Sequence, residues 1–151
     1  ALPTQLYLST NASDYDTFLK INRPKYDDSW ERWNKTLEML AELDTRTVLR
    51  VTLIKDWNDS EKMITGFASI FEKSNAHFVE MKSYMHIGRS TNRLEYENMV
   101  DMADIRKFTE KISNKSDRFE VMDESEISRI VVLQNKERFT DRYLSAYQET
   151  N

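Results

Sequence analysis

The stretch FVEMKSYM, residues 78–85, places a glutamate and a lysine at alternate positions in a mostly apolar segment. Side chains two residues apart on a β-strand point to the same face, so Glu80 and Lys82 share one face. Val79 and Met81 share the opposite face. This segment therefore predicts a strand with one face for the core and one face for chemistry or for contact with water.

Two further segments, residues 5–10 and 46–54, show the same division into a polar and an apolar face. The polar positions of these two segments are Gln5, Tyr7, Ser9, Arg50 and Thr52. Polar faces that align on neighbouring strands predict a surface that binds a ligand. The alternative is that these side chains pair with one another or contact solvent, and the residues alone leave both interpretations open.

Strand and helix patterns alternate along the rest of the chain. The predicted strands cover residues 5–10, 46–54, 77–85, 118–122 and 128–136. The predicted helices, which have apolar residues at helical spacing, cover residues 28–43, 60–74, 102–113 and a short segment from Phe139. This alternation is typical of βα units with a mainly parallel sheet, and right-handed crossovers put successive helices on the same side.

We therefore expect a single α/β domain over residues 1–151, with helices on one side of a mainly parallel sheet and the polar faces on the other. Such a sheet is either an open two-layer structure or a fragment of a partial βα barrel with a polar lumen. A closed barrel packs its interior with branched apolar residues, so a polar interior indicates an open barrel that holds a ligand.

Composition limits the possible classes of function. The 151 residues carry a net charge of −4 and include no cysteine and two glycines. Without cysteine the chain has no disulfide, no thiol nucleophile and no cysteine-held zinc or iron–sulfur cluster. The negative charge makes any RNA contact local, and the few glycines exclude a glycine-rich phosphate loop.

The beginning of the chain does not look like a targeting segment. No apolar run approaches the roughly 20 residues of a membrane span, and the first residues lack the pattern of a signal peptide. We expect a cytoplasmic protein with no membrane partner. Because the chain begins with Ala1 rather than methionine, we also expect it to be a piece of something longer.

Four stretches follow one another in the order seen in a known family: PTQLYLSTNAS, INRPKYDDSWERWNKTLEMLAELDTRTVLRVTLIK, FVEMKSYMHIGRSTNRL and ESEISRIVVLQ. The sequence resembles the archaeal tRNA 4-demethylwyosine synthases, which are radical S-adenosylmethionine enzymes (lyases) of wyosine biosynthesis. The most specific parts are TQLYLS, RTVLRVTLIK and the K-x-Y-M-x-x-G-x-S-x-x-R-L run that begins at Lys82.

This resemblance implies a partial βα barrel that holds a 4Fe-4S cluster and S-adenosylmethionine at the carboxyl edge of its strands. It implies reductive cleavage of that cofactor to a 5′-deoxyadenosyl radical. The radical would remove hydrogen from the methyl group of N1-methylguanosine beside the anticodon of phenylalanine tRNA. Pyruvate would then supply the carbons that close the third ring of 4-demethylwyosine.

The matching stretches correspond to the C-terminal half of such an enzyme. The family's C-x-x-x-C-x-x-C motif, the cysteines of its second cluster and the lysine thought to hold pyruvate lie upstream. The resemblance therefore implies that this chain alone is inactive and binds no metal, and that Lys82 is not the pyruvate lysine. We expect the isolated half to expose a strand edge and to self-associate.

Several roles carry over from the family residue by residue. The positions that imply contacts with S-adenosylmethionine are Ser9, Arg50, Thr52 and Asn58. Glu80 and Lys82 are implied as the catalytic pair on the next strand. A buried lysine needs a partner, because an unpaired charge there costs several kcal/mol or loses its proton. We expect Glu80, alone or with Arg50, to form a network that leaves Lys82 to contact a carboxylate of cofactor or substrate.

The loop after this strand contains GRSTNRL, residues 88–94. Arg89 and Arg93 in this loop suit the phosphate oxygens of tRNA or a carboxylate. The alternative is an ordinary solvated loop, since surface charge is common.

The sequence departs from the family pattern at three positions. Asn11 stands where many members have aspartate, Ser13 replaces a proline and Asp56 replaces a glycine. Aspartate takes a positive φ less cheaply than glycine, so these departures concern the geometry of the loops and not the faces of the strands.

The histidines and tryptophans offer weaker signals. His77 and His86 have no second ligand at a recognisable metal spacing, so we interpret both as structural or solvated. Trp30 and Trp33 lie on the apolar stripe of a predicted helix and are expected in the core. Trp57 lies on a predicted loop, and for this ring a role in stacking on a base stays open.

The rival interpretation is a non-catalytic α/β module that binds a nucleotide or RNA and never held a cluster. The two interpretations differ in what precedes Ala1. A reading frame that continues upstream into a segment with cysteines favours the enzyme, and a reading frame that starts at Ala1 favours the binding module.

Overall fold

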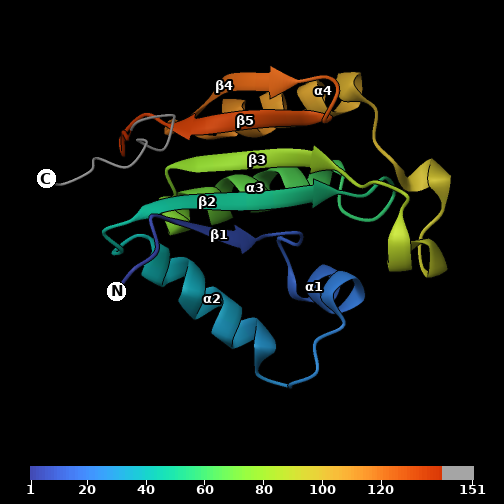
Figure 1. Cartoon of the computed structure of the whole chain (residues 1–151), viewed down its shortest axis with the longest axis horizontal. Helices are drawn as coiled ribbons and strands as arrows, with labels where there is room; N and C mark the ends of the chain where they lie inside the picture. The colour runs from blue at the N-terminus through green and yellow to red at the C-terminus, as the bar shows by residue number, and fades with distance from the viewer. Residues whose placement is uncertain (141–151) are drawn as a thin grey trace, which may run out of the picture.

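The computed structural model describes residues 1–140, which form a five-stranded sheet of order β1-β2-β3-β5-β4 (Figure 1). The strands are β1 (Gln5–Ser9), β2 (Arg46–Leu53), β3 (Phe78–Ser83), β4 (Phe119–Ser125) and β5 (Ile130–Asn135). β1, β2 and β3 are parallel, β5 is antiparallel to β3, and β4 is antiparallel to β5. The carboxyl ends of β1 to β3 therefore meet at one edge of the sheet, which we call the carboxyl edge.

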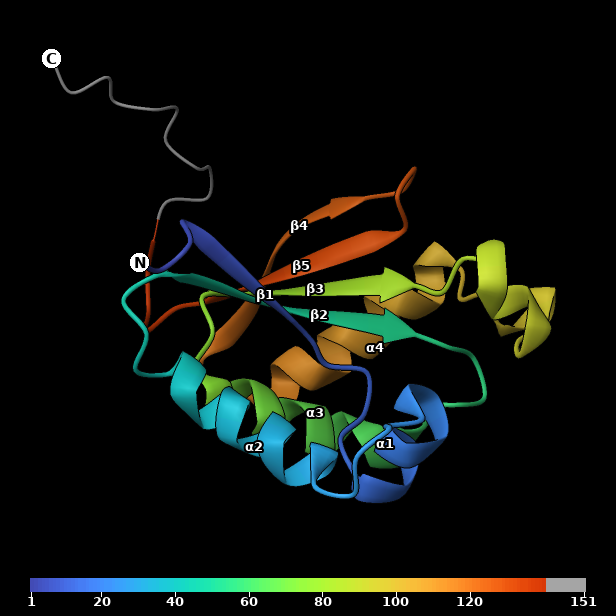
Figure 2. The ribbon, with the colours of Figure 1, turned by 60° about the horizontal axis from the view of Figure 1, so that its bottom comes forward.

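The helices form one layer. They are α1 (Tyr15–Asn22), α2 (Ser29–Leu40), α3 (Glu61–Ser74) and α4 (Met102–Lys115), with two short 3₁₀ helices, η1 (Gly88–Asn92) and η2 (Tyr96–Asn98). Within the described residues, α2, α3 and α4 lie against one face of the sheet, and no helix covers the other face (Figure 2). We call the uncovered side the open face. None of the described helices is long and apolar enough to cross a membrane.

The core fills the space between the sheet and α3 and α4. Phe67 and Phe71 follow one another at helical spacing on α3 and are fully buried. Phe67 contacts Phe108 of α4 with ring centroids 6.2 Å apart, and Phe71 contacts Phe119 of β4 at 5.9 Å. Burying an aromatic ring contributes about 2–3 kcal/mol, so these rings fix α3 and α4 against the sheet.

The predicted α/β class and the single helical layer are confirmed, but the sheet is mixed rather than mainly parallel. The difference arises between β4 and β5, which only residues 126–129 connect. A parallel connection needs a dozen or more residues, whereas a short connection joins antiparallel strands. Arg129 takes the left-handed conformation, with φ 49°, as the hairpin turns into β5.

One helix was not predicted from the sequence. α1 lies after β1, in a stretch for which the sequence predicted neither a helix nor a strand. Asp14 caps this helix by accepting from the backbone N–H of Thr17 at 2.8 Å, and Phe18 is its buried anchor. The capping pattern was visible in the sequence, but the helix has too few apolar residues for a clear stripe. The short helix predicted from Phe139 falls mostly on residues 141–151, which lie outside the described part of the chain.

Candidate functional site

The open face carries the polar side chains that the sequence predicted for it. Strand register pairs Ser9 with Arg50 and Arg50 with Glu80, so these residues form one row across β1, β2 and β3. Thr52 and Lys82 form the next row towards the carboxyl edge. The intervening residues on each strand, such as Val51 and Val79, are fully buried on the helix side. The predicted division between the two faces of each strand is therefore confirmed.

Arg50, Glu80 and Tyr7 form a network on this face. The Arg50 Nε donates to Glu80 Oε2 at 2.9 Å, and the Tyr7 hydroxyl donates to Glu80 Oε1 at 3.4 Å. The Arg50 guanidinium also lies over the Tyr7 ring, 4.5 Å from its centroid. Both oxygens of one carboxylate thus fix two neighbouring side chains. The network of Arg50 and Glu80 that the sequence predicted is present, but Lys82, for which it was expected to serve as partner, is not part of it.

Lys82 is placed differently from its neighbours. It is half-buried, and within residues 1–140 its ammonium group has no hydrogen bond or ion pair. Its partners in register are Thr52 on β2 and Ile130 on β5, neither of which carries a charge. An ammonium group with three donors and no protein acceptor is suited to bind an anion from outside the sheet.

The half of the open face that lies towards the amino ends of β1 to β3 is less polar. Val48 and Phe78 are buried there and form the floor of a cavity of ≈ 170 Å³. Tyr7 and Glu80 line the same cavity from the polar side, and Arg46 lies over the Phe78 ring at 4.6 Å. The open face therefore has a hollow with an apolar floor and polar walls next to its charged row.

The side chain of Asn58, predicted to contact cofactor, is fully buried in the loop after β2. Its Oδ1 accepts from the Ile54 N–H at 2.8 Å, and its Nδ2 donates to the carbonyls of Asn11 and Thr52 at 2.9 and 2.8 Å. Both amide hydrogens are used, so Asn58 holds two loops together. A cofactor contact by this side chain stays a prediction that the geometry does not favour.

Asn11, which the sequence marked only as a departure from the family, has a structural role of its own. Its Oδ1 accepts from the backbone N–H of Thr52 at 2.9 Å, which ties the end of β1 to β2. Ser9, at the end of β1, is exposed, and its carbonyl accepts from Trp33 Nε1 at 3.2 Å. Ser9 and Thr52 keep their predicted cofactor roles as predictions, since their side chains lie on the open face.

The loop after β2 also contains the departure at Asp56. This residue takes the left-handed conformation, with φ 67°, although it is not glycine. Its backbone N–H donates to the Asp59 carboxylate at 2.9 Å, which holds the turn. The turn therefore forms with aspartate where the family has glycine.

The two arginines of the loop after β3 differ in their surroundings. Arg93 donates from Nη1 to the Ile21 carbonyl at 3.2 Å and from Nη2 to the Lys20 carbonyl at 2.8 Å, at the carboxyl end of α1. Arg89 is exposed on η1 and has no partner among the described residues. Arg93 thus has a structural role beside its predicted contact with tRNA, and Arg89 is available for such a contact.

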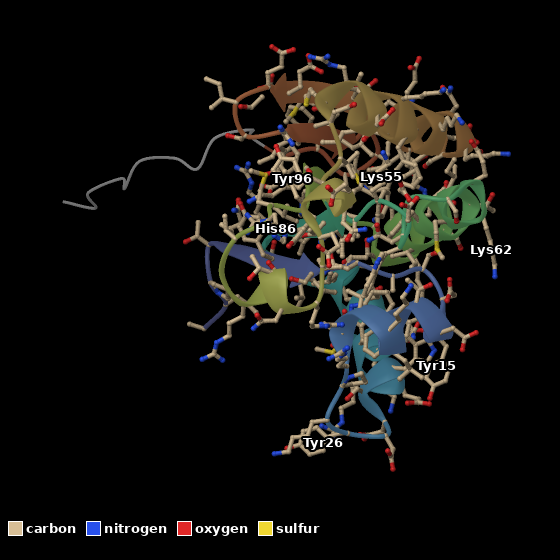
Figure 3. The ribbon with its side chains drawn as sticks, turned by 90° about the vertical axis from the view of Figure 1, so that its right-hand side faces the viewer. Tyr15, Tyr26, Lys55, Lys62, His86 and Tyr96 are labelled. Atoms are coloured by element: carbon tan, nitrogen blue, oxygen red, sulfur yellow. The ribbon has the colours of Figure 1, made fainter. Side chains whose placement is uncertain are left out.

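Figure 3 looks onto the carboxyl edge and shows His86 and Tyr96 on the segment between β3 and α4. The Tyr84 hydroxyl lies 3.0 Å from His86 Nδ1. Tyr84 also belongs to a small apolar cluster with Ile54 and Leu94, separate from the main core. His86 therefore packs against this cluster, in keeping with its predicted structural role.

His77 lies at the opposite edge, before β3. Its Nδ1 accepts from the backbone N–H of Thr47 at 3.0 Å. Burial, together with the positive charges of Arg138 and Arg46, lowers the pKa of His77 to about 4. A neutral histidine that accepts a backbone hydrogen bond is structural, as the sequence predicted.

Trp30 and Trp33 stack on each other with ring centroids 5.2 Å apart. Both are half-buried and contact Phe18 of α1, at 5.2 and 5.9 Å. Trp33 also packs against the main core, whereas Trp30 joins α1 to α2. The two rings are structural, although neither is fully buried.

Comparison with known proteins gives consistent matches. A family model described as wyosine base formation matches residues 73–135. The S-adenosyl-L-methionine-dependent tRNA 4-demethylwyosine synthase of Pyrococcus abyssi is 42% identical over 134 residues, which are 87% of this chain and 38% of that protein. The protein of the same name from Methanocaldococcus jannaschii is 40% identical over 136 residues, 90% of this chain and 42% of that protein.

A solved structure matches as well. The structure described as TYW1 with a lysine-pyruvate adduct bound is 37% identical, with a TM-score of 0.79, and the match covers 90% of this chain and 42% of that chain. The resemblance to the tRNA 4-demethylwyosine synthases that the sequence indicated is confirmed. The chain spans about two fifths of these two archaeal relatives, at 38% and 42% of their lengths.

Proposed function

We propose that this chain is the C-terminal part of an S-adenosyl-L-methionine-dependent tRNA 4-demethylwyosine synthase, and that its open face lines the reaction chamber of that enzyme. The substrate would be N1-methylguanosine beside the anticodon of phenylalanine tRNA, with pyruvate as the second substrate. The names of the relatives and the pyruvate adduct described for the solved TYW1 structure support this proposal. In the complete enzyme the sheet would form part of a partial βα barrel.

The observation that carries the proposal is the unequal pairing of charges on the open face. Arg50 and Glu80 neutralise each other through an ion pair of 2.9 Å. Lys82, in the next row on β3, has no protein partner within the described residues. A half-buried ammonium group without a counter-charge is costly unless a ligand supplies the negative charge. We assign Lys82 to a carboxylate of substrate or cofactor, with Glu80 holding the adjacent network.

The same face has groups that fit S-adenosylmethionine. The hydroxyls of Ser9 and Thr52 suit a ribose or an amino group, and the Arg50 guanidinium suits a carboxylate. A 4Fe-4S cluster would supply the electron that cleaves this cofactor to a radical. The chain contains no cysteine, so other parts of the enzyme would hold the cluster. Within residues 1–140 there is also no group of three histidines and carboxylates that could bind a metal.

A product assay tests this function. The full-length protein that contains this chain is reconstituted with iron and sulfide and supplied with S-adenosylmethionine, a reductant, pyruvate and tRNA carrying N1-methylguanosine. Mass analysis of the digested tRNA should detect the tricyclic nucleoside, and its formation should require both S-adenosylmethionine and pyruvate. A full-length protein that binds tRNA but forms no product would favour the non-catalytic binding module instead.

A further inference from the structure

Four exposed cations lie on α1, on the connection that follows it and after η1: Lys20, Arg23, Lys25 and Arg93. We call these four residues the basic ridge. Lys20 lies in the last turn of α1, Arg23 and Lys25 lie in the connection between α1 and α2, and Arg93 follows η1. All four are exposed, although three of them are separated from the fourth by about 70 residues of chain.

Trp57 brings the two parts of the ridge together. The Lys20 Nζ lies 4.2 Å from the centroid of the Trp57 ring, and the Arg93 guanidinium lies 5.9 Å from it. The hydrogen bonds from Arg93 to the carbonyls of Lys20 and Ile21 fix the end of α1 at this position. Two positive charges are therefore held on one indole ring at the carboxyl edge.

The connection that carries the other two cations is also fixed. The Arg23 N–H donates to the Leu19 carbonyl at 3.1 Å, with Arg23 in the left-handed conformation at φ 44°. The Ser29 N–H donates to the Tyr26 carbonyl at 3.2 Å, which closes a turn before α2. A turn held at both ends presents its side chains without a large loss of backbone entropy on binding.

An exposed aromatic ring accompanies the cations. Tyr26 is 55% exposed and projects at one end of the carboxyl edge, as Figure 3 shows. The Lys25 Nζ lies 5.7 Å from its ring centroid and the Arg32 guanidinium 5.4 Å from it. A tyrosine flanked by cations can stack on an unpaired base while the cations contact phosphates.

The ridge is not neutralised by nearby carboxylates. Within residues 1–140, none of its four cations is in an ion pair. Two acidic residues, Asp27 and Asp28, follow Tyr26, and Asp28 is bound by Arg32 at 2.8 Å. The protein as a whole has a net charge of −4, so this local group of cations without a paired carboxylate indicates an anionic partner.

We propose that the basic ridge binds the sugar-phosphate backbone of RNA, with Tyr26 stacking on an unpaired base. This inference rests on the proposed function, because Lys20 and Arg93 of the ridge lie at the carboxyl edge, the edge at which the resemblance implies that cofactor is held. Four separate cations fit a chain of phosphates better than a single small anion. The exposed Tyr26 ring, with its polar hydroxyl, fits an unpaired base of an RNA loop better than a lipid surface. The ridge would hold the tRNA at the carboxyl edge.

The test uses the full-length protein with Lys82→Met in every sample, so that binding is measured without turnover. The probe is a transcript of phenylalanine tRNA, and its Kd is measured over a series of salt concentrations. The double variant Arg23→Gln/Lys25→Gln is compared with Lys115→Gln/Lys136→Gln, which removes the same charge from exposed residues distant from the ridge. Circular dichroism checks that both variants fold.

The ridge variant should bind the transcript roughly tenfold more weakly at about 0.1 M salt, and the slope of log K against log salt should fall by about 2, since two phosphate contacts are lost. The control variant should match the parent protein. Equal losses of tRNA affinity in both variants, or no loss in the ridge variant, would overturn the proposal. Binding to anionic lipid vesicles is measured alongside, and a ridge variant that loses only its vesicle binding would also overturn it. If the ridge variant alone loses affinity but the full-length protein with Lys82 intact forms no product in the product assay, the RNA site stands and the proposed reaction fails.

Discussion

Glu80 and Lys82 lie two residues apart on the same face of β3 but have different surroundings. Glu80 accepts hydrogen bonds from Arg50 and Tyr7, whereas Lys82 has no partner within residues 1–140. The side chains of Arg50 and Glu80 are 45% and 19% exposed, and an ion pair at this exposure contributes about 0.2–1 kcal/mol. The network is therefore better suited to orient side chains than to stabilise the fold.

A double-mutant cycle separates these two roles. We expect Arg50→Gln, Glu80→Gln and the double variant of this chain to give a coupling free energy below about 1 kcal/mol, because water screens the pair. Urea unfolding of the four proteins measures this value. A coupling of about 3 kcal/mol or more would make the pair a structural feature and remove the reason to assign it to a ligand.

The pKa of His77 predicts a pH dependence of stability. The folded protein holds this pKa at about 4, below the ordinary value of 6.5, so the unfolded chain binds a proton in this range and the folded chain does not. The free energy of unfolding should therefore fall as the pH drops from 6.5 towards 4. In His77→Gln this part of the fall should disappear, although other groups still titrate.

Urea midpoints of the wild-type and His77→Gln proteins between pH 7 and pH 4 measure this difference. The difference between the two urea midpoints should be largest at pH 7 and should shrink as the pH falls towards 4. Parallel curves over the whole range would show that His77 does not couple to folding.

The sequence predicted which residues share the open face, because the period of two in a strand is read directly from the order of residues. It did not predict the hydrogen-bond partners of Asn58 and Arg93. The Asn58 amide contacts Asn11, 47 residues away, and Arg93 contacts Lys20, 73 residues away. Such partners depend on the folded arrangement of loops, which no local pattern encodes.

At the scale of the elements, α3 approaches the loop after β1 through Gly66. A Cβ at this position would lie 2.5 Å from Ser13 Oγ and 2.6 Å from Ser13 Cβ. Glycine inside a helix costs about 1 kcal/mol relative to alanine, so close packing explains why it stands here. Ser13 is also one of the positions at which the sequence departs from the family.

We expect Gly66→Ala to destabilise the chain by about 1–2 kcal/mol, because the clash outweighs the gain in helix propensity. In a Ser13→Gly background the same substitution should become neutral or stabilising by up to about 1 kcal/mol, since the obstructing side chain is gone. Thermal or urea unfolding of the four proteins measures both effects. If Gly66→Ala has the same effect in both backgrounds, Ser13 is not the obstacle.

Helices with long apolar patterns were predicted correctly, whereas the direction of β5, which depends on the connection before it, was not. The apolar stripes of α2, α3 and α4 were recognisable, and each helix lies within about three residues of its predicted limits. β4 and β5 were recognised as strands, but their direction depends on a connection of four residues, 126–129. α1 was missed because one buried phenylalanine, Phe18, is too little to show a period.

At the scale of the whole molecule, β1 and β4 are the edge strands of the sheet formed by residues 1–140. The outer edge of β1 has no strand partner there, and the chain spans 38% to 42% of its archaeal relatives from Pyrococcus abyssi and Methanocaldococcus jannaschii. An unpaired edge beside an uncovered polar face favours pairing with another chain.

We therefore expect the isolated chain to self-associate as its concentration rises. Sedimentation velocity over a wide concentration range measures this, with the full-length protein as the comparison, because its additional segments should cover the edge. A chain that remains monomeric and fully soluble at high concentration would contradict the expectation.

The most direct test of the account is the product yield of Lys82→Met in the full-length protein. Methionine keeps most of the length of the side chain but removes the charge that we assign to a carboxylate of substrate or cofactor. We predict that formation of the tricyclic base is abolished or sharply reduced, while the circular dichroism and the absorbance of the clusters stay unchanged. Lys62→Met, on the exposed face of α3, is the matched control and should leave the yield unchanged. A Lys82→Met protein that makes product at the normal rate would contradict the account, and the charges of the open face would then be structural pairing alone.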